Sequence, residues 1–191
     1  MQSLYGYIKQ FANITLEEFE KIASLVEIFQ FDKKQVLTQK GQVEQYLYII
    51  RTGLVRKFFY KNKYEIVTQL AREQDLVCSS VSFLSQQPSE YVVETLEPCT
   101  VFAMSYENLQ KIYSWNSHMD RLGRLIILDW LLQKEIWEHD RLRHEPRERF
   151  IRFMKENSDL VQRVQQKYLA SYLNMKPETF SRYKHLLRGD H

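Results

Sequence analysis

The segment from Gln166 to Leu187 constrains the fold of this chain more than any other stretch. Two apolar stripes with helical spacing lie in it: Leu169, Ala170, Leu173, and then Phe180, Tyr183, Leu187. Asn174 lies between them, and asparagine is one of the few residues that tolerate the left-handed conformation of a sharp turn. Pro177 follows, and proline is favoured in the first turn of a helix. The segment therefore predicts a helix-turn-helix.

The outer face of the predicted second helix is polar and basic. It carries Glu178, Thr179, Ser181, Arg182, Lys184 and His185. An exposed helix of this kind, set at a steep angle by a short turn, is how the major groove of DNA is usually read. An ordinary helical hairpin in a core would explain the apolar stripes alone. The predicted DNA-binding residues are Lys167, Lys176, Glu178, Thr179, Ser181, Arg182 and Lys184.

Charge is distributed unevenly along the chain. Residues 1–140 hold 15 Lys and Arg against 18 Asp and Glu, a net of −3, whereas residues 141–191 hold 12 against 6, a net of +6. The basic charge thus accompanies the helix-turn-helix, as expected for a surface that contacts the phosphate backbone. A merely solvated surface would also be compatible with this charge.

Length and composition narrow the class of protein. A chain of 191 residues can form one large or two modest domains. No apolar run is long enough to span a membrane, and the N-terminus has no signal-peptide pattern. Cys78 and Cys99 form no disulfide framework, so a reducing, cytoplasmic location is expected.

The part before the helix-turn-helix divides into helical and strand patterns. Residues 5–29 are predicted to be helical, with a capping box from Thr15 to Glu18. Residues 31–104 contain short apolar runs separated by glycine and asparagine turns, which predicts a small antiparallel barrel or roll. An irregular segment at 75–90 interrupts the strands, and residues 106–113 predict a short helix.

Residues 117–140 predict one long helix. Its centre, from Leu125 to Leu132, is apolar on nearly all sides and carries one charge, Asp129. We expect one side to pack on the roll of the same chain and the other on the same helix of a second chain, giving a homodimer. The alternative is a core helix buried entirely within one chain.

The residues after the long helix predict a hinge and then a separate domain. Pro146 disfavours helix at the preceding residue, which marks a boundary after Arg141. A helix is expected at 147–156 and a loop at 157–159. The predicted fold class is α+β, with a sensor β-roll domain at 1–115, a dimerisation helix at 116–141 and a helix-turn-helix domain at 142–191.

This order of elements resembles the Crp/Fnr family of bacterial transcription regulators. The resemblance covers essentially the whole chain and rests on the sequence motifs at 35–41, 46–56, 75–77 with Phe83, 166–170 and 177–182. It implies a cyclic-nucleotide-binding-like roll (a double-stranded β-helix), a winged helix-turn-helix, and a homodimer on a pseudo-palindromic site of double-stranded DNA.

The resemblance also implies roles for single residues. Positions matching Glu178 and Arg182 touch base edges in the family, where an arginine can donate two hydrogen bonds to a guanine. Thr179, Ser181 and Lys184 would more plausibly hold phosphates. Pro177 replaces a base-reading arginine of the best-known member, so the recognised sequence should differ.

The sensor half departs from family members that bind cyclic AMP. Cys78 and Ser79 stand in place of a glycine and a ribose-binding glutamate, and Ser89 and Glu90 in place of the arginine and serine that bind the phosphate. Loss of the arginine and gain of a carboxylate argue against cyclic AMP. A candidate pocket for an unidentified, neutral effector comprises Cys78, Ser79, Ser80, Ser89 and Glu90. These serines could equally be ordinary loop residues.

Other functions are disfavoured. Two cysteines cannot supply the four ligands of an iron–sulfur cluster, and no histidine precedes His118, so the roll offers no histidine ligand for haem or a cupin-type metal site. No catalytic motif is evident, so neither an enzyme nor a cofactor or metal is expected. The remaining alternatives are a small-molecule sensor or scaffold whose helix-turn-helix only packs and, less favoured, a cupin-type metalloenzyme.

Overall fold

The computed structural model describes residues 1–189, with side chains described as far as His185. Residues 27–105 form a roll of two four-stranded antiparallel sheets, with strand orders β1-β8-β3-β6 and β2-β7-β4-β5. The strands are β1 (Glu27–Phe31), β2 (Val36–Thr38), β3 (Tyr46–Thr52), β4 (Val55–Lys61), β5 (Tyr64–Ala71), β6 (Leu76–Val77), β7 (Val92–Thr95) and β8 (Cys99–Ser105).

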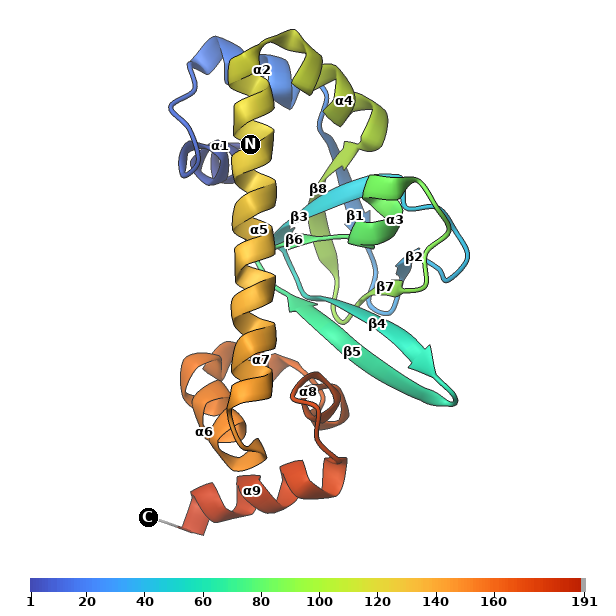
Figure 1. The fold of residues 1–191 in the computed structure, drawn as a ribbon, viewed down its shortest axis with the longest axis vertical. Helices are drawn as coiled ribbons and strands as arrows, with labels where there is room; N and C mark the ends of the chain where they lie inside the picture. The colour runs from blue at the N-terminus through green and yellow to red at the C-terminus, as the bar shows by residue number, and fades with distance from the viewer. Residues whose placement is uncertain (190–191) are drawn as a thin grey trace.

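The long helix α5 runs beside the roll, and further helices are grouped near each of its ends (Figure 1). One group lies near the N-terminal end of α5 and the other near its C-terminal end. The helices are α1 (Gln2–Lys9), α2 (Leu16–Ala23), α3 (Ser80–Ser85), α4 (Tyr106–Trp115), α5 (Ser117–Arg143), α6 (Pro146–Glu156), α7 (Ser158–Arg163), α8 (Gln166–Tyr172) and α9 (Pro177–Gly189). The C-terminal group therefore stands as a helical unit beside the strand pair β4–β5.

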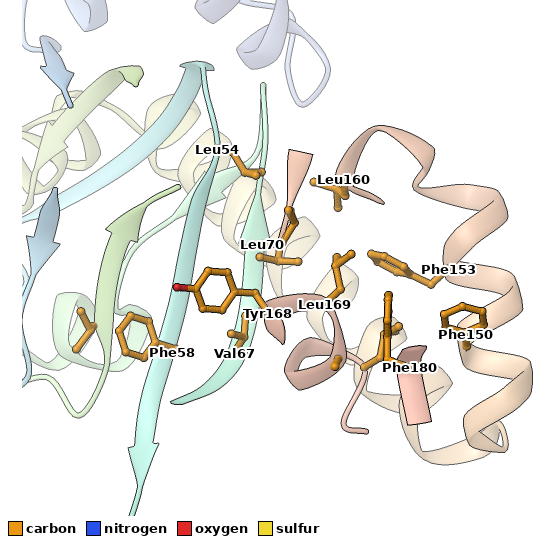
Figure 2. Close-up of a cluster of buried hydrophobic side chains, with 14 residues drawn as sticks. Leu54, Phe58, Val67, Leu70, Phe150, Phe153, Leu160, Tyr168, Leu169 and Phe180 are labelled. Atoms are coloured by element: carbon orange, nitrogen blue, oxygen red, sulfur yellow. The ribbon is translucent and has the colours of Figure 1, made fainter. Parts of the chain in front are cut away.

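Three buried apolar clusters hold these parts together. The first lies between the two sheets and includes Ile50, Val77 and Val101. The second lies between the outer face of the first sheet and helices α1, α2, α4 and α5. The third joins the outer face of β4 and β5 to the C-terminal helices, so this unit and the roll share one continuous core (Figure 2).

Two glycines permit close contacts that a side chain would block. Gly53 has φ +108°, and a Cβ there would lie 2.5 Å from Cys99 Sγ. A Cβ on Gly123 of α5 would lie 2.0 Å from the ring of Tyr113 on α4. Glycine is therefore required where the chain turns between β3 and β4 and where α4 meets α5.

The α+β class, the roll and the long helix predicted from the sequence are confirmed, with local corrections. The helix expected at 5–29 is wrong, because the Thr15 capping box starts a second helix and β1 begins at Glu27. The loop expected at 157–159 is wrong, because α7 begins at Ser158. The long helix continues to Arg143, beyond the expected ends at 140 and 141.

The C-terminal unit also differs from what the resemblance implies. Residues 144–189 form helices and turns without a strand, so the described residues include no β wing. The predicted inward position of the Leu187 side chain and the end of the third predicted domain at His191 lie outside the described residues. The division into three domains stays a prediction.

Candidate functional site: the second helix of the helix-turn-helix and the 78–91 segment

Helices α8 and α9 are joined by the sharp turn predicted from Asn174. Asn174 has φ 53°, in the left-handed region, and the Met175 N–H donates to the Ala170 carbonyl over 2.9 Å. Helix α9 then begins at Pro177, where the missing N–H leaves no hydrogen bond unmade. The helix-turn-helix is thus formed where the sequence predicts it.

The inner side of this motif is a tightly packed core. Leu169, Ala170 and Leu173 are buried, as is Phe180 of α9. The Phe180 ring meets that of Phe150 edge-on at a centroid distance of 5.1 Å. In Figure 2 both rings lie on the side of Leu169 away from the sheet. Helix α9 is therefore fixed on its inner side by α6 and α8.

The predicted DNA-binding residues lie on the outer side of the motif. Lys167, Lys176, Glu178 and Arg182 are exposed, whereas Thr179, Ser181 and Lys184 are half-buried. The Arg182 guanidinium carbon lies 5.5 Å from the centre of the Tyr183 ring, and the Lys167 ammonium lies 4.7 Å from that of Tyr168. None of these seven side chains forms a salt bridge within the described residues.

Helix α8 is anchored directly on the strands of the roll. Ser171 Oγ accepts from the Val67 N–H and donates to the Glu65 carbonyl, both over 2.9 Å. The Arg56 guanidinium lies 4.0 Å from the ring centres of both Phe58 and Tyr168. Figure 2 shows Tyr168 reaching from α8 to the strands that carry Phe58 and Val67. The first helix of the motif is therefore held on β4 and β5.

A second contact joins α7 to the turns of the roll. The Arg163 guanidinium donates two 2.9 Å hydrogen bonds to Glu73 and also pairs with Glu97. The hydrogen bonds from Arg163 lower the pKa of Glu73 to about 2. Beside it, Arg72 pairs with Asp159 at 2.5 Å. These pairs could not be predicted from the sequence, because their members lie up to 90 positions apart.

The candidate effector residues do not form one set facing a common space. Cys78, Ser79 and Ser89 are buried, and Ser89 Oγ donates to Ser79 Oγ over 2.7 Å. Burial raises the pKa of the Cys78 thiol, which disfavours a reactive thiolate. Ser80 is half-buried in the first turn of α3. Ser79 and Ser89 therefore bond to each other, and the predicted serine-lined pocket stays a prediction.

Glu90 lies apart from these buried residues. It is exposed and pairs with Lys40 at 2.9 Å. The Lys40 charge therefore offsets that of Glu90 at the surface. The Glu90 carboxylate should repel a phosphate less strongly than the sequence alone predicts.

Sequence reasoning missed a buried ammonium group beside Cys78. Lys57 is 9% exposed, and its Nζ donates to the Cys78 carbonyl over 3.3 Å. It also lies 5.8 Å from the Trp130 ring centre on α5. Burial lowers its pKa to about 8. Only the fold brings this side chain between the roll and α5.

The described residues contain no group of three or more His, Cys, Asp or Glu side chains that could hold a metal ion. Within them, no helix has the length and apolar character needed to cross a membrane.

Comparisons with known proteins agree with this architecture. Residues 28–116 match the family described as "Cyclic nucleotide-binding domain". No curated protein matches the chain. The c-di-GMP responsive global regulator CLP of Xanthomonas campestris has a similar structure, with 16% identity and a TM-score of 0.70 over 92% of this chain and 93% of that chain.

Two other solved structures have the same arrangement. FixK2 from Bradyrhizobium japonicum is 17% identical with a TM-score of 0.72, over 86% of this chain and 85% of that chain. The Thermus thermophilus catabolite activator protein is 19% identical with a TM-score of 0.56, over 94% and 86%. The chain therefore shares the fold of these structures: an antiparallel roll of the cyclic nucleotide-binding type followed by a long helix and further helices.

Proposed function

We propose that this protein is a sequence-specific DNA-binding transcription regulator that acts as a homodimer. The proposal rests on the contrast between the buried inner side and the exposed outer side of α9. Its inner side is anchored by buried Phe180, while Lys176, Glu178 and Arg182 are exposed and free of ion pairs among the described residues. A fixed helix with such an outer face fits the major groove of DNA. The excess of basic charge in the same part of the chain favours a polyanionic partner.

Each side chain has a role that its chemistry allows. Arg182 can donate two hydrogen bonds to a guanine, and Glu178 can accept one from a cytosine amine. The half-buried Thr179, Ser181 and Lys184 are suited to phosphates, which fix register without reading sequence. Lys167 and Lys176 would flank this surface and add phosphate contacts.

The exposed side of α5 supports the homodimer. Leu128, Leu131, Leu132 and Ile136 are between 48% and 58% exposed there. A continuous apolar stripe on a long helix is stabilised by pairing, and a second copy supplies the same stripe. Such a dimer would place two copies of α9 on half-sites about 34 Å apart, one turn of DNA.

The contacts between the roll and the C-terminal helices would connect sensing to DNA binding. Ser171 and Arg163 hold α8 and α7 against the roll, so a ligand that moves β5 or the Glu73 turn would also move α9. We propose that such an effector, still unidentified, is not cyclic AMP, because Ser79 and Ser89 use their hydroxyl groups on each other.

Selection of random duplex DNA by the purified full-length protein tests the proposal. The bound pool is sequenced after selection at two salt concentrations. We expect a pseudo-palindrome with half-sites one turn apart and an affinity that falls steeply with salt. Absence of enrichment, together with binding that is insensitive to salt, would favour a sensor or scaffold whose helix-turn-helix only packs.

A pair of leucine variants tests the homodimer. Leu132→Glu places a charge in the exposed stripe of α5 and should shift the protein to monomers in sedimentation equilibrium. Leu84→Glu on α3 is the control, because its leucine is similarly exposed but lies outside α5. If both variants remain dimeric, α5 is not the dimer interface.

A further inference from the structure

Four aromatic rings cluster on the inner face of the first sheet, at an open side of the roll. Phe29 and Phe31 come from β1, and Tyr46 and Tyr48 from β3. Centroid distances are 6.0 Å for Phe29–Phe31, 5.3 Å for Phe29–Tyr46, 6.3 Å for Phe31–Tyr48 and 6.0 Å for Tyr46–Tyr48. The strand between them, β8, contributes small Val101 and Ala103 to this face, so the rings can meet above it.

The rings line a groove of about 640 Å³, defined here as the aromatic groove. Tyr48 is buried at its base, whereas the other three rings are half-buried. The remaining lining residues are Val36, Leu37, Thr38, Gln42, Val43, Glu44 and Gln45. Because these three rings are only partly covered by the chain itself, part of each ring is accessible to a ligand.

One carboxyl group lines the aromatic groove and a second lies on β1 beside it. Glu44 lines it and is 2% exposed, with its Oε2 accepting from Thr38 Oγ1 over 2.6 Å and from the Ser79 N–H over 3.0 Å. Glu27 lies on the same face of β1 as Phe29 and Phe31, since alternate residues of a strand point the same way. Burial and then the Glu27 charge raise the pKa of Tyr46, which indicates that this carboxylate is close to the Tyr46 hydroxyl.

Among the described residues, no lysine or arginine stacks on the rings of this groove. Lysine and arginine groups stack instead on Tyr5, Phe58, Tyr64, Tyr91, Trp130, Tyr168 and Tyr183. Within the same residues, neither Glu27 nor Glu44 forms a salt bridge. Among the described residues, the rings therefore have no stacked cation and the two carboxyl groups have no salt bridge, and the Lys57 ammonium beside Cys78 acts on Glu44 only through its charge.

We propose that the aromatic groove binds a small organic cation of the quaternary or methylated ammonium class. Ring faces carry negative potential and attract a weakly hydrated cation within about 6 Å of the ring centroid. The two carboxylates add attraction for the same charge and repel anions such as phosphates. Glu44 also bonds to the Ser79 N–H, so a cation bound beside it would lie next to the buried serine pair.

Titration calorimetry on the full-length protein, with no DNA present, tests this site independently of the proposed DNA binding. The probes are tetramethylammonium and choline, with 3,3-dimethylbutan-1-ol as the neutral carbon analogue of choline. We expect both cations to bind and the neutral analogue to bind at least tenfold more weakly. Equal binding of choline and the neutral analogue, or no binding of either cation at millimolar concentration, would overturn the proposal.

Matched variants assign the binding to these residues. Tyr46→Leu should weaken choline binding by roughly threefold to tenfold, whereas Tyr46→Phe, which keeps the ring, should retain most of it. Glu27→Gln should weaken choline binding without altering that of the neutral analogue. Tyr60→Leu, which removes an exposed ring outside the groove, is the control for general effects. Unchanged affinity in Tyr46→Leu and Glu27→Gln, with wild-type circular dichroism, would place the cation elsewhere and contradict the proposal.

Discussion

The outer face of α9 and the 78–91 segment both carry hydroxyl groups but use them in opposite ways. The outer face of α9 also carries several charged groups, whereas Glu90 is the one charged residue of the 78–91 segment. On α9 these groups are exposed or half-buried and form no salt bridge within the described residues. In the 78–91 segment, Ser79, Ser82 and Ser89 are buried and bonded to one another or to the backbone.

This difference indicates where a ligand can form new hydrogen bonds. A polar group that already has its partners inside the fold gains little from a ligand, because one hydrogen bond must break to form another. A solvated group on a fixed helix can exchange water for a ligand at small cost. The α9 surface is therefore ready to bind, whereas a ligand in the 78–91 segment would have to rearrange it.

The largest effect is expected on the inner side of α9. Phe180→Ala should lower the free energy of unfolding by about 3–5 kcal/mol, because it empties a site that is 1% exposed. Arg182→Ala, two residues away and exposed, should change it by less than about 0.5 kcal/mol. Urea denaturation followed by circular dichroism measures both, and equal losses would show that α9 is not anchored on one side only.

The helix-turn-helix was predictable because its signals are local. The left-handed Asn174, the helix-starting Pro177 and the apolar residue Phe180 of the second helix are short-range features, and each lies as expected. The strands were predictable for the same reason. The break between α1 and α2 was missed because the apolar pattern continues through it, although the Thr15 capping box marks it.

The next effect concerns the outer side of the same helix. Arg182→Ala should weaken binding to the selected DNA by about 1–3 kcal/mol and relax base preference at one position per half-site. Lys184→Ala should weaken binding more uniformly across sequences and reduce its salt dependence. Repeating the random-DNA selection with each variant distinguishes them. A uniform loss for Arg182→Ala would make that residue a phosphate contact.

A smaller effect is expected in the 78–91 segment. Ser89→Ala should destabilise the fold by about 1–2 kcal/mol, because the buried Ser79 hydroxyl and the Tyr91 N–H lose their partner. Ser181→Ala on α9 should have almost no effect on stability. The same urea denaturation compares them. Equal stability of the two serine variants would mean that the 78–91 segment is hydrated and open to ligands after all.

The features that the sequence did not reveal are pairs of residues distant in the chain. The packing of helices on the roll brings Lys57 beside Trp130 and Arg163 beside Glu73, and the strand order brings together the rings of β1 and β3. Each member alone suggests a surface charge or an ordinary core residue. The hydrogen bond from Ser89 to Ser79, ten positions earlier, was not predicted either, and the candidate effector pocket stays a prediction.

The smallest effect concerns the contact between Arg163 of α7 and Glu73 of the roll. Arg163 lowers the pKa of Glu73 to about 2, below its usual value of 4.5. A lowered pKa stabilises the fold above about pH 4.5, and this contribution is lost as pH falls toward 2. Because the Glu73 side chain is 38% exposed, solvent screening limits it to roughly 1 kcal/mol.

Glu73→Gln should therefore lower the free energy of unfolding at pH 7 and flatten its decline between pH 5 and 3. Glu90→Gln is the matched control, because its partner Lys40 is more exposed and neutralising that carboxylate should change little. Urea denaturation across this pH range measures both variants. If Glu73→Gln keeps the full acid sensitivity of the wild type, the contact does not hold α7 against the roll, and the path proposed from roll to α9 must run through Ser171 alone.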